Sequence, residues 1–140
     1  MFSRINRLVF IAQTTMYFLI YSSYKTSDFT ADELKALLVQ SRQKNSISDI
    51  TGMLLLCGWQ FVQMLEGEEK NVKLLYHHIC NDDRHKSIVL LKEGFMESRV
   101  FSDWSMGFNT VSSESFKEIE GYQRLNAATA LQLFKKLSES

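Results

Sequence analysis

The chain of 140 residues contains no proline, two cysteines and six glycines, and its 16 basic and 16 acidic residues cancel. Cys57 and Cys80 are too few for a disulfide framework, so we expect a reducing, cytoplasmic compartment. A net charge of zero argues against a global field that recruits nucleic acid or an anionic membrane. No apolar run approaches the length of a membrane span. No repeat or low-complexity tract divides the chain, and its length fits one domain.

Motifs of common enzymes are also missing. The sequence has no Gly-rich phosphate loop, no Ser-His-Asp order and no paired-carboxylate site, which argues against an ordinary hydrolase. His77, His78, Cys80 and His85 lie near one another in sequence, but adjacent helical residues point about 100° apart and cannot chelate one ion together. We therefore expect neither a metal site nor an enzyme.

Hydrophobic periodicity predicts seven elements in the order βαββαββ. Thr30 and Glu33 have the spacing of a capping box, which predicts a helix over 31–44. Gly58-Trp59 fits a two-residue hairpin turn between strands at 50–57 and 60–66. The remaining predictions are a first strand from Met16, a second helix after Gly67 that ends near Asn81-Asp82, and strands at 87–91 and 101–108. This order predicts an α+β, ferredoxin-like sandwich, with a mixed sheet and both helices on one face.

The sequence divides into an N-terminal extension over 1–15, a domain over 16–110 and a helical tail over 111–140. On the sheet face opposite the helices we expect a surface too apolar to stay in water, made of Phe18, Ile20, Met53, Leu55, Cys57, Val62 and Met64. An amphipathic stripe in the tail offers a cover, made of Ala130, Leu133, Phe134 and Leu137. A symmetric partner is a compatible alternative, so we expect a homo-oligomer through this face or the tail.

Gln63 breaks the expected pattern of a buried strand. Alternation along 60–66 places Gln63 between Phe61 and Leu65 on one face, and the hairpin register places it opposite Leu54. An amide without partners there would cost roughly 1–3 kcal/mol. The same alternation along the first strand places Tyr21 on this side of the sheet. Tyr21 is therefore predicted to be a polar partner for Gln63. Periodicity favours a simple buried Tyr–Gln hydrogen bond at least as much as a ligand site.

Six segments, in order and with matching spacing, closely resemble the BLUF family, the sensors of blue light using FAD. The likeness runs from about 16 to 108. The segments are Leu19-Ile20-Tyr21-Ser22-Ser23, Ser41-Arg42-Gln43-Lys44-Asn45, Ile50-Thr51-Gly52-Met53-Leu54, Phe61-Val62-Gln63-Met64-Leu65-Glu66-Gly67, Asp82-Asp83-Arg84-His85 and Trp104-Ser105-Met106.

The resemblance implies a noncovalent flavin between the two helices, FAD in the family, with FMN or riboflavin as substitutes in a preparation. Tyr21 and Gln63 are implied to face the ring, while Asn45, and Arg84 or His85, are implied to hydrogen-bond its polar edge. The full set of flavin-binding residues that it implies is Tyr21, Ser23, Leu37, Leu38, Asn45, Leu54, Phe61, Gln63, Ile79, Asp82, Arg84 and His85.

The resemblance further implies a photochemical role for Tyr21 and Gln63. Tyr21 is implied to give an electron and a proton to the excited flavin, leaving Gln63 rotated or tautomerised and the absorption shifted to the red. Trp104 and Met106 are implied to exchange places and carry the signal. We expect a stand-alone sensor that acts through a separate protein effector, without nucleic acid or membrane. The alternatives are a flavin-dependent redox protein, which the absence of a separate acid or base disfavours, and a non-photoactive interaction module.

Overall fold

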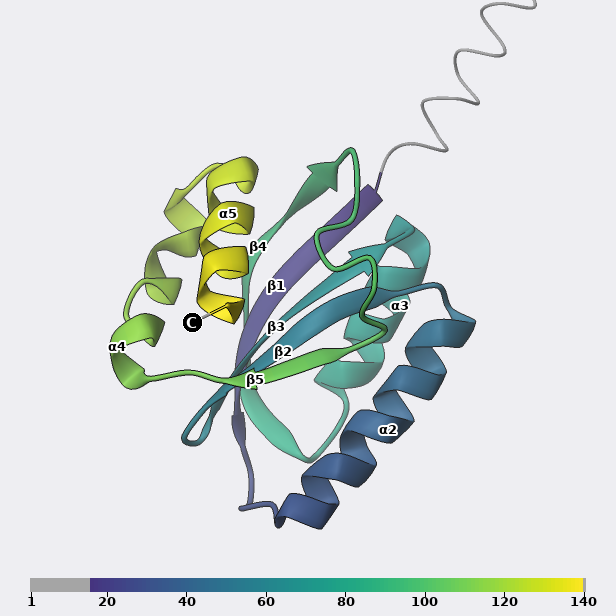
Figure 1. Cartoon of the computed structure of the whole chain (residues 1–140), viewed down its shortest axis with the longest axis vertical. Helices are drawn as coiled ribbons and strands as arrows, with labels where there is room; N and C mark the ends of the chain where they lie inside the picture. Colours follow the sequence, from purple (N-terminus) through teal and green to yellow (C-terminus); the bar gives the residue numbers. More distant parts are fainter. Residues whose placement is uncertain (1–15, 140) are drawn as a thin grey trace, which may run out of the picture.

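One mixed sheet forms the centre of the molecule, with strand order β4-β1-β3-β2-β5 (Figure 1). The computed structural model describes residues 16–139, so the predicted extension over 1–15 lies outside the described residues. Neighbouring strands pair antiparallel, except that β5 pairs parallel with β2. The strands are β1 (Met16–Lys25), β2 (Thr51–Cys57), β3 (Gln60–Gly67), β4 (His85–Met96) and β5 (Gly107–Thr110).

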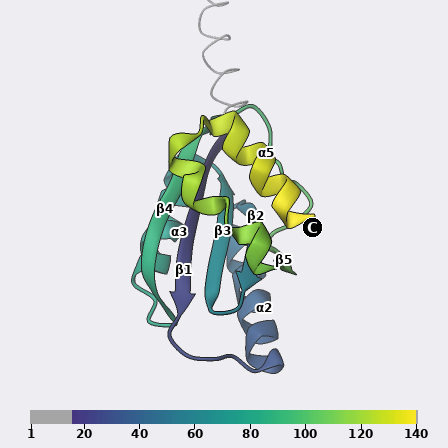
Figure 2. The same ribbon diagram turned by 90° about the vertical axis from the view of Figure 1, so that its left-hand side faces the viewer.

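Helices cover both faces of this sheet (Figure 2). On one face lie α2 (Ala31–Ile47), which begins with the predicted Thr30–Glu33 capping box, and α3 (Glu69–Cys80). On the other lie α4 (Ser113–Phe116), the 3-10 helix η1 (Ile119–Arg124) and α5 (Ala127–Ser138). Among residues 16–139, no helix combines the length and apolarity needed to cross a bilayer. The predicted ferredoxin-like sandwich is confirmed.

The β2–β3 hairpin has the predicted register. Cys57 pairs with Gln60 and Leu54 pairs with Gln63. Gly58 has a φ of +60°, a conformation that glycine adopts without strain at the first position of a two-residue turn. On its other side β3 pairs with β1, and that register places Gln63 directly opposite Tyr21, so both side chains reach one side of the sheet.

The sheet separates two apolar clusters. Leu19, Leu65 and Val72 belong to the cluster beneath α2 and α3. The opposite cluster joins the face predicted to be apolar to the tail, where Ala130 and Phe134 are fully buried. The predicted cover by the tail is therefore confirmed.

The prediction for the last strand was wrong in its bounds. A strand was predicted over 101–108, with Trp104 and Met106 on one side, but β5 begins at Gly107. Ser105 and Met106 precede it, and their carbonyl groups accept hydrogen bonds from side chains of α2. Trp104 is 52% exposed, whereas Met106 is 1% exposed. The chain bends at these residues because two successive carbonyls face one helix, whereas regular strand alternation would point them to opposite sides.

A buried carboxylate anchors the loop that leads to this segment. Glu66, at the end of β3, is fully buried and accepts backbone N–H bonds from Val100 and Phe101 at 2.7–3.0 Å. Burial raises the pKa of Glu66, and these hydrogen bonds together with the nearby Arg99 oppose the rise. The loop is thus tied to β3 before the chain reaches Trp104.

Candidate functional site

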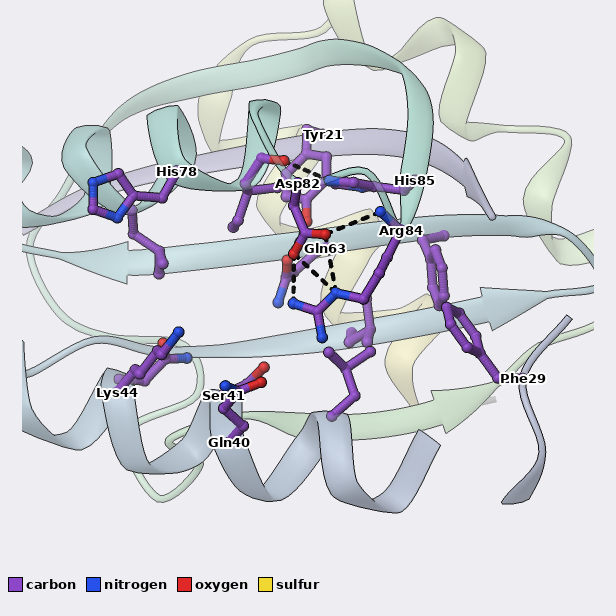
Figure 3. Close-up of a pocket in the computed structure, with 16 residues that line it drawn as sticks. Tyr21, Phe29, Gln40, Ser41, Lys44, Gln63, His78, Asp82, Arg84 and His85 are labelled. Carbon is purple, nitrogen blue, oxygen red and sulfur yellow. Dashed lines mark hydrogen bonds and ion pairs between the residues drawn. The ribbon is translucent and has the colours of Figure 1, made fainter. Parts of the chain in front are cut away.

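A cavity of about 220 Å³ opens between α2, α3 and the sheet. Tyr21, Leu54, Phe61 and Gln63 line it from β1, β2 and β3, and Phe29 lines it from the loop before α2. The remaining walls come from α2, α3, the turn after α3 and the start of β4, and Tyr21 and Gln63 lie side by side at the back of the cavity (Figure 3). The predicted flavin-binding residues that line it are Tyr21, Leu37, Asn45, Leu54, Phe61, Gln63, Ile79, Asp82, Arg84 and His85.

Two of the predicted binding residues lie behind the wall of the cavity. Ser23 is fully buried and hydrogen-bonds His85, and Leu38 is 8% exposed within the apolar cluster beneath the helices. The lining residues that were not predicted are Phe29, Gln40, Ser41, Lys44, Leu75 and His78. Ser41 and Leu75 share helical stripes with predicted site residues and could have been found by periodicity. Gln40, Lys44 and His78 lie on the polar rim, where periodicity carries no signal.

The phenol of Tyr21 donates a hydrogen bond to Oε1 of Gln63 in the wall of this cavity. The two residues are 3% and 7% exposed. Burial raises the pKa of Tyr21 well above that of a free tyrosine, because the phenolate would lose its hydration. The phenol is therefore neutral at physiological pH and able to donate.

The amide of Gln63 has a second partner in Met106. Its Nε2 lies 3.1 Å from the sulfur of Met106 and donates to it. A thioether sulfur is a weak acceptor, so this contact is easily exchanged. Because an amide nitrogen carries two N–H groups, one remains for a molecule in the cavity.

Asn45 lines the cavity from α2. Its Nδ2 donates to the carbonyl oxygen of Ser105 at 2.7 Å, and the residue is 3% exposed. This bond fixes the orientation of the amide, which leaves Oδ1 to accept from a ligand N–H. Asn45 thus joins α2, the cavity and the segment before β5.

The turn after α3 places charge at the mouth of the cavity, where Arg84 points toward Asp82 (Figure 3). The Nε of Arg84 lies 2.9 Å and 3.0 Å from the two carboxylate oxygens of Asp82. The hydrogen bonds from Arg84 lower the pKa of Asp82 to about 2, so the pair is ionised at neutral pH. Arg84 retains further N–H donors for a ligand.

His85 lines the same end of the cavity but directs both ring nitrogens to protein atoms. Its Nε2 lies 2.6 Å from the carbonyl oxygen of Ile79, so Nε2 carries the proton and donates it. Its Nδ1 lies 2.9 Å from Oγ of Ser23, and the two atoms share a hydrogen bond. The prediction that His85 bonds a ligand directly stays a prediction.

These features fit a planar aromatic ring with one polar edge. Leu37, Leu54, Phe61 and Ile79 supply apolar surface, while Asn45 and Gln63 supply amide groups on one side. Pockets that enclose a whole drug-sized ligand measure ~300–1,000 Å³. The cavity of about 220 Å³ is smaller, so it suits the ring of a flavin rather than an entire dinucleotide.

Comparisons with known proteins identify this class of site. The sequence model of the BLUF family, the sensors of blue-light using FAD, matches residues 16–107. The blue light- and temperature-regulated antirepressor BluF of Escherichia coli (strain K12) is 38% identical over 88 residues, which are 63% of this chain and 22% of that protein. The photoactivated adenylate cyclase subunit beta of Euglena gracilis is 31% identical over 116 residues, 74% of this chain and 14% of that protein.

Solved structures agree with the sequence relatives. The photo-activated state of BlsA superposes with a TM-score of 0.75 at 25% identity and covers 89% of this chain and 96% of that one. The dark state of the BLUF protein BlrB gives a TM-score of 0.69 at 25% identity, with 89% and 95% covered. The fold and the site therefore define a flavin-binding light sensor.

The chain belongs to the BLUF family. It is a blue-light photoreceptor that uses FAD. The chain spans less than a quarter of the length of the two curated relatives described above.

Proposed function

We propose that the isoalloxazine ring of FAD binds in the cavity between α2 and α3, and that light rearranges the Tyr21–Gln63 hydrogen bond. The rearranged state absorbs at longer wavelength, reverts in darkness and is passed to a separate protein partner. The observation that carries this proposal is the buried hydrogen bond from Tyr21 to Gln63 in the wall of a cavity with apolar sides.

The ring is held by apolar walls and by hydrogen bonds at one edge. Leu37, Leu54, Phe61 and Ile79 exclude water from its faces, which strengthens the polar contacts at the edge. The bond from Nδ2 of Asn45 to the carbonyl oxygen of Ser105 uses one of its two N–H groups, which leaves Oδ1 and the second N–H for the edge of the ring. Arg84 supplies cationic N–H donors from the mouth.

The other predicted residues orient this set. Asp82 holds the guanidinium of Arg84 in a forked ion pair, which limits the orientations that Arg84 can adopt. Ser23 holds the ring of His85 from behind the wall. Leu38, on the buried side of α2, packs into the apolar cluster and fixes the position of that helix on the sheet.

Tyr21 and Gln63 perform the photochemical step. When bound, the flavin absorbs blue light, and its excited state is an electron acceptor strong enough to oxidise a phenol. Tyr21 gives up the electron and releases its proton along the existing hydrogen bond to Oε1 of Gln63. When the electron and a proton return to Tyr21, the Gln63 amide is left rotated or tautomerised. Its hydrogen bond into the cavity is then stronger, which lowers the energy of the optical transition.

Met106 is the first residue to sense the change in Gln63. In the structure its sulfur accepts from Nε2 of Gln63, whereas a rotated amide would present an oxygen to it. Two acceptors do not attract, so the sulfur loses its partner and the side chain repacks. The side chain of Trp104, which is half exposed, then takes the place of Met106. Such an exchange between two discrete packings is what a switch requires.

The output passes to a separate partner without enzymatic chemistry in this chain. The E. coli relative is described as an antirepressor and the Euglena relative as a cyclase, so in both the light-sensing region controls another activity. We place this sensor in the cytoplasm and assign its partner contact to protein. The tail already covers the apolar sheet face, so self-association uses the outer surface of the tail.

Replacement of Gln63 by leucine tests the proposal. Gln63→Leu removes the group that bridges Tyr21 and the cavity, so we expect bound flavin without a light-induced red shift in the visible spectrum. Gln60 lies on the same strand but faces the opposite side of the sheet, so Gln60→Leu serves as the control and should show an unchanged red shift. A normal red shift in Gln63→Leu would overturn the proposed mechanism.

A further inference from the structure

Helix α2 holds the segment before β5 at two successive carbonyl groups. Asn45 donates to the carbonyl oxygen of Ser105 at 2.7 Å, and Nε of Arg42 donates to that of Met106 at 2.9 Å. Arg42 and Asn45 are three residues apart and therefore lie on one side of the helix. Arg42 does not line the cavity, so its contact is with the segment and not with a ligand.

Met106 is consequently held at both ends. Its carbonyl oxygen accepts from Arg42, while its sulfur accepts from Gln63 at 3.1 Å. Within residues 16–139, Arg42 makes no ion pair with a carboxylate, so no acidic side chain competes for its Nε. The hydrogen bond to Met106 is the polar contact that fixes this half-buried guanidinium.

We propose that Arg42 is a positioning residue for the photoreaction. By holding the backbone of Met106, it sets the distance between the sulfur of Met106 and the amide of Gln63. This inference rests on the proposed function. A methionine side chain is flexible and its sulfur is a weak acceptor, so the N–H···S contact depends on where the backbone of Met106 is fixed. Arg42 supplies that fixed point with a planar, always charged donor.

The rate of dark recovery reports this role. Recovery requires Gln63 to regain the arrangement in which its N–H faces the sulfur. If Met106 is no longer held, that arrangement is less stable and the return is slower. We expect Arg42→Leu to bind flavin and to shift to the red like the wild type, but to recover about threefold to tenfold more slowly. Gln43→Leu, an exposed position on the same helix, should recover at the wild-type rate.

A second readout does not need flavin. In flavin-free protein labelled with ¹³C at the methionine methyl groups, the Met106 signal is assigned by its loss in Met106→Leu. We expect this signal to move in Arg42→Leu and to stay in place in Gln43→Leu. If Arg42→Leu does not fold, Arg42→Lys keeps the charge, lacks the Nε–H fork and should move the signal in the same way.

A double-mutant cycle separates positioning from a general structural role. In a Met106→Leu background there is no sulfur to position, so Arg42→Leu should change the recovery rate no further. The same slowing in both backgrounds would overturn the inference, as would an unmoved Met106 methyl signal together with wild-type recovery in Arg42→Leu. Failure of the wild type to shift at all would instead overturn the proposed function. The methyl signal would then still decide whether Arg42 positions Met106.

Discussion

Tyr21 and Gln63 stand directly opposite each other on β1 and β3, and the phenol of Tyr21 donates to the amide oxygen of Gln63. Their backbone pairing brings the two side chains together without help from a loop. Because the strands are central in the sheet, the geometry of this pair is set by the most rigid part of the fold. A light-driven change in this hydrogen bond therefore starts from a well-defined arrangement.

Tyr21→Phe should abolish the red-shifted state while flavin remains bound. The variant removes the phenol that donates the electron and proton, and it leaves Oε1 of Gln63 without its donor, at a cost of about 1–3 kcal/mol in unfolding free energy. Light-minus-dark absorbance and urea unfolding measure both effects. Tyr24→Phe changes a half-exposed tyrosine on the same strand and should alter neither. A full red shift in Tyr21→Phe would show that another residue is the donor.

The pH dependence of switching follows from the raised pKa of Tyr21. An ordinary tyrosine ionises near pH ~10, but burial keeps the phenol of Tyr21 neutral above that value. The neutral, buried phenol therefore makes a pH-dependent contribution to the free energy of unfolding. That contribution is fully present below pH ~10 and is lost above it, as the unfolded chain ionises first. We expect the amplitude of the red shift to stay constant up to the pH at which the protein unfolds. A titration of the amplitude near pH 10 in folded protein, checked by circular dichroism, would contradict this.

The Asp82–Arg84 pair should contribute little to stability. Its side chains are 30% and 49% exposed, so solvent screening reduces the contribution to below about 1 kcal/mol. The pKa of Asp82 is lowered to about 2, so the contribution is present above pH ~4 and is lost as the pH falls toward 2. Urea unfolding of Asp82→Asn across this range should show a slightly lower and flatter profile than the wild type. A loss of several kcal/mol at neutral pH would indicate that the pair supports the fold.

Phe134 should be a main support of the tail on the sheet. Its ring is fully buried and meets Phe101 edge to face, with centroids 5.9 Å apart. Phe134→Ala should lower the unfolding free energy by about 3–5 kcal/mol, because a cavity replaces the ring. Lys135→Ala, at the exposed neighbouring position, should change it by less than about 0.5 kcal/mol. Equal stability of the two variants would show that the tail does not cover this face.

Much of the site could be predicted because the inner strands keep a strict period of two. The parity of 60–66 and the turn at Gly58 were enough to place Gln63 opposite Leu54, and the structure has that register. Leu37 and Ile79 also line the cavity, as the resemblance to the family implied. Residues that face a common layer in regular elements are recoverable from sequence, since the backbone geometry alone directs them.

The segment before β5 could not be predicted in this way. The alternation from Phe101 to Phe108 resembles a strand, yet the carbonyls of Ser105 and Met106 bond side chains on a helix about 60 residues earlier. Contacts between a side chain and a distant backbone carbonyl leave no periodic trace. Arg42 belongs to one of the segments that resemble the family, but its contact with Met106 was not predicted for the same reason, because an arginine on a helix is usually a solvated residue.

The visible spectrum of the purified chain in darkness, after blue light and during return to darkness is the most direct measurement. We predict a flavin spectrum that shifts to longer wavelength under blue light and returns fully in the dark. Bound flavin with no shift, or a protein that takes up no flavin at all, would contradict the assignment of Tyr21 and Gln63 as a light-driven switch.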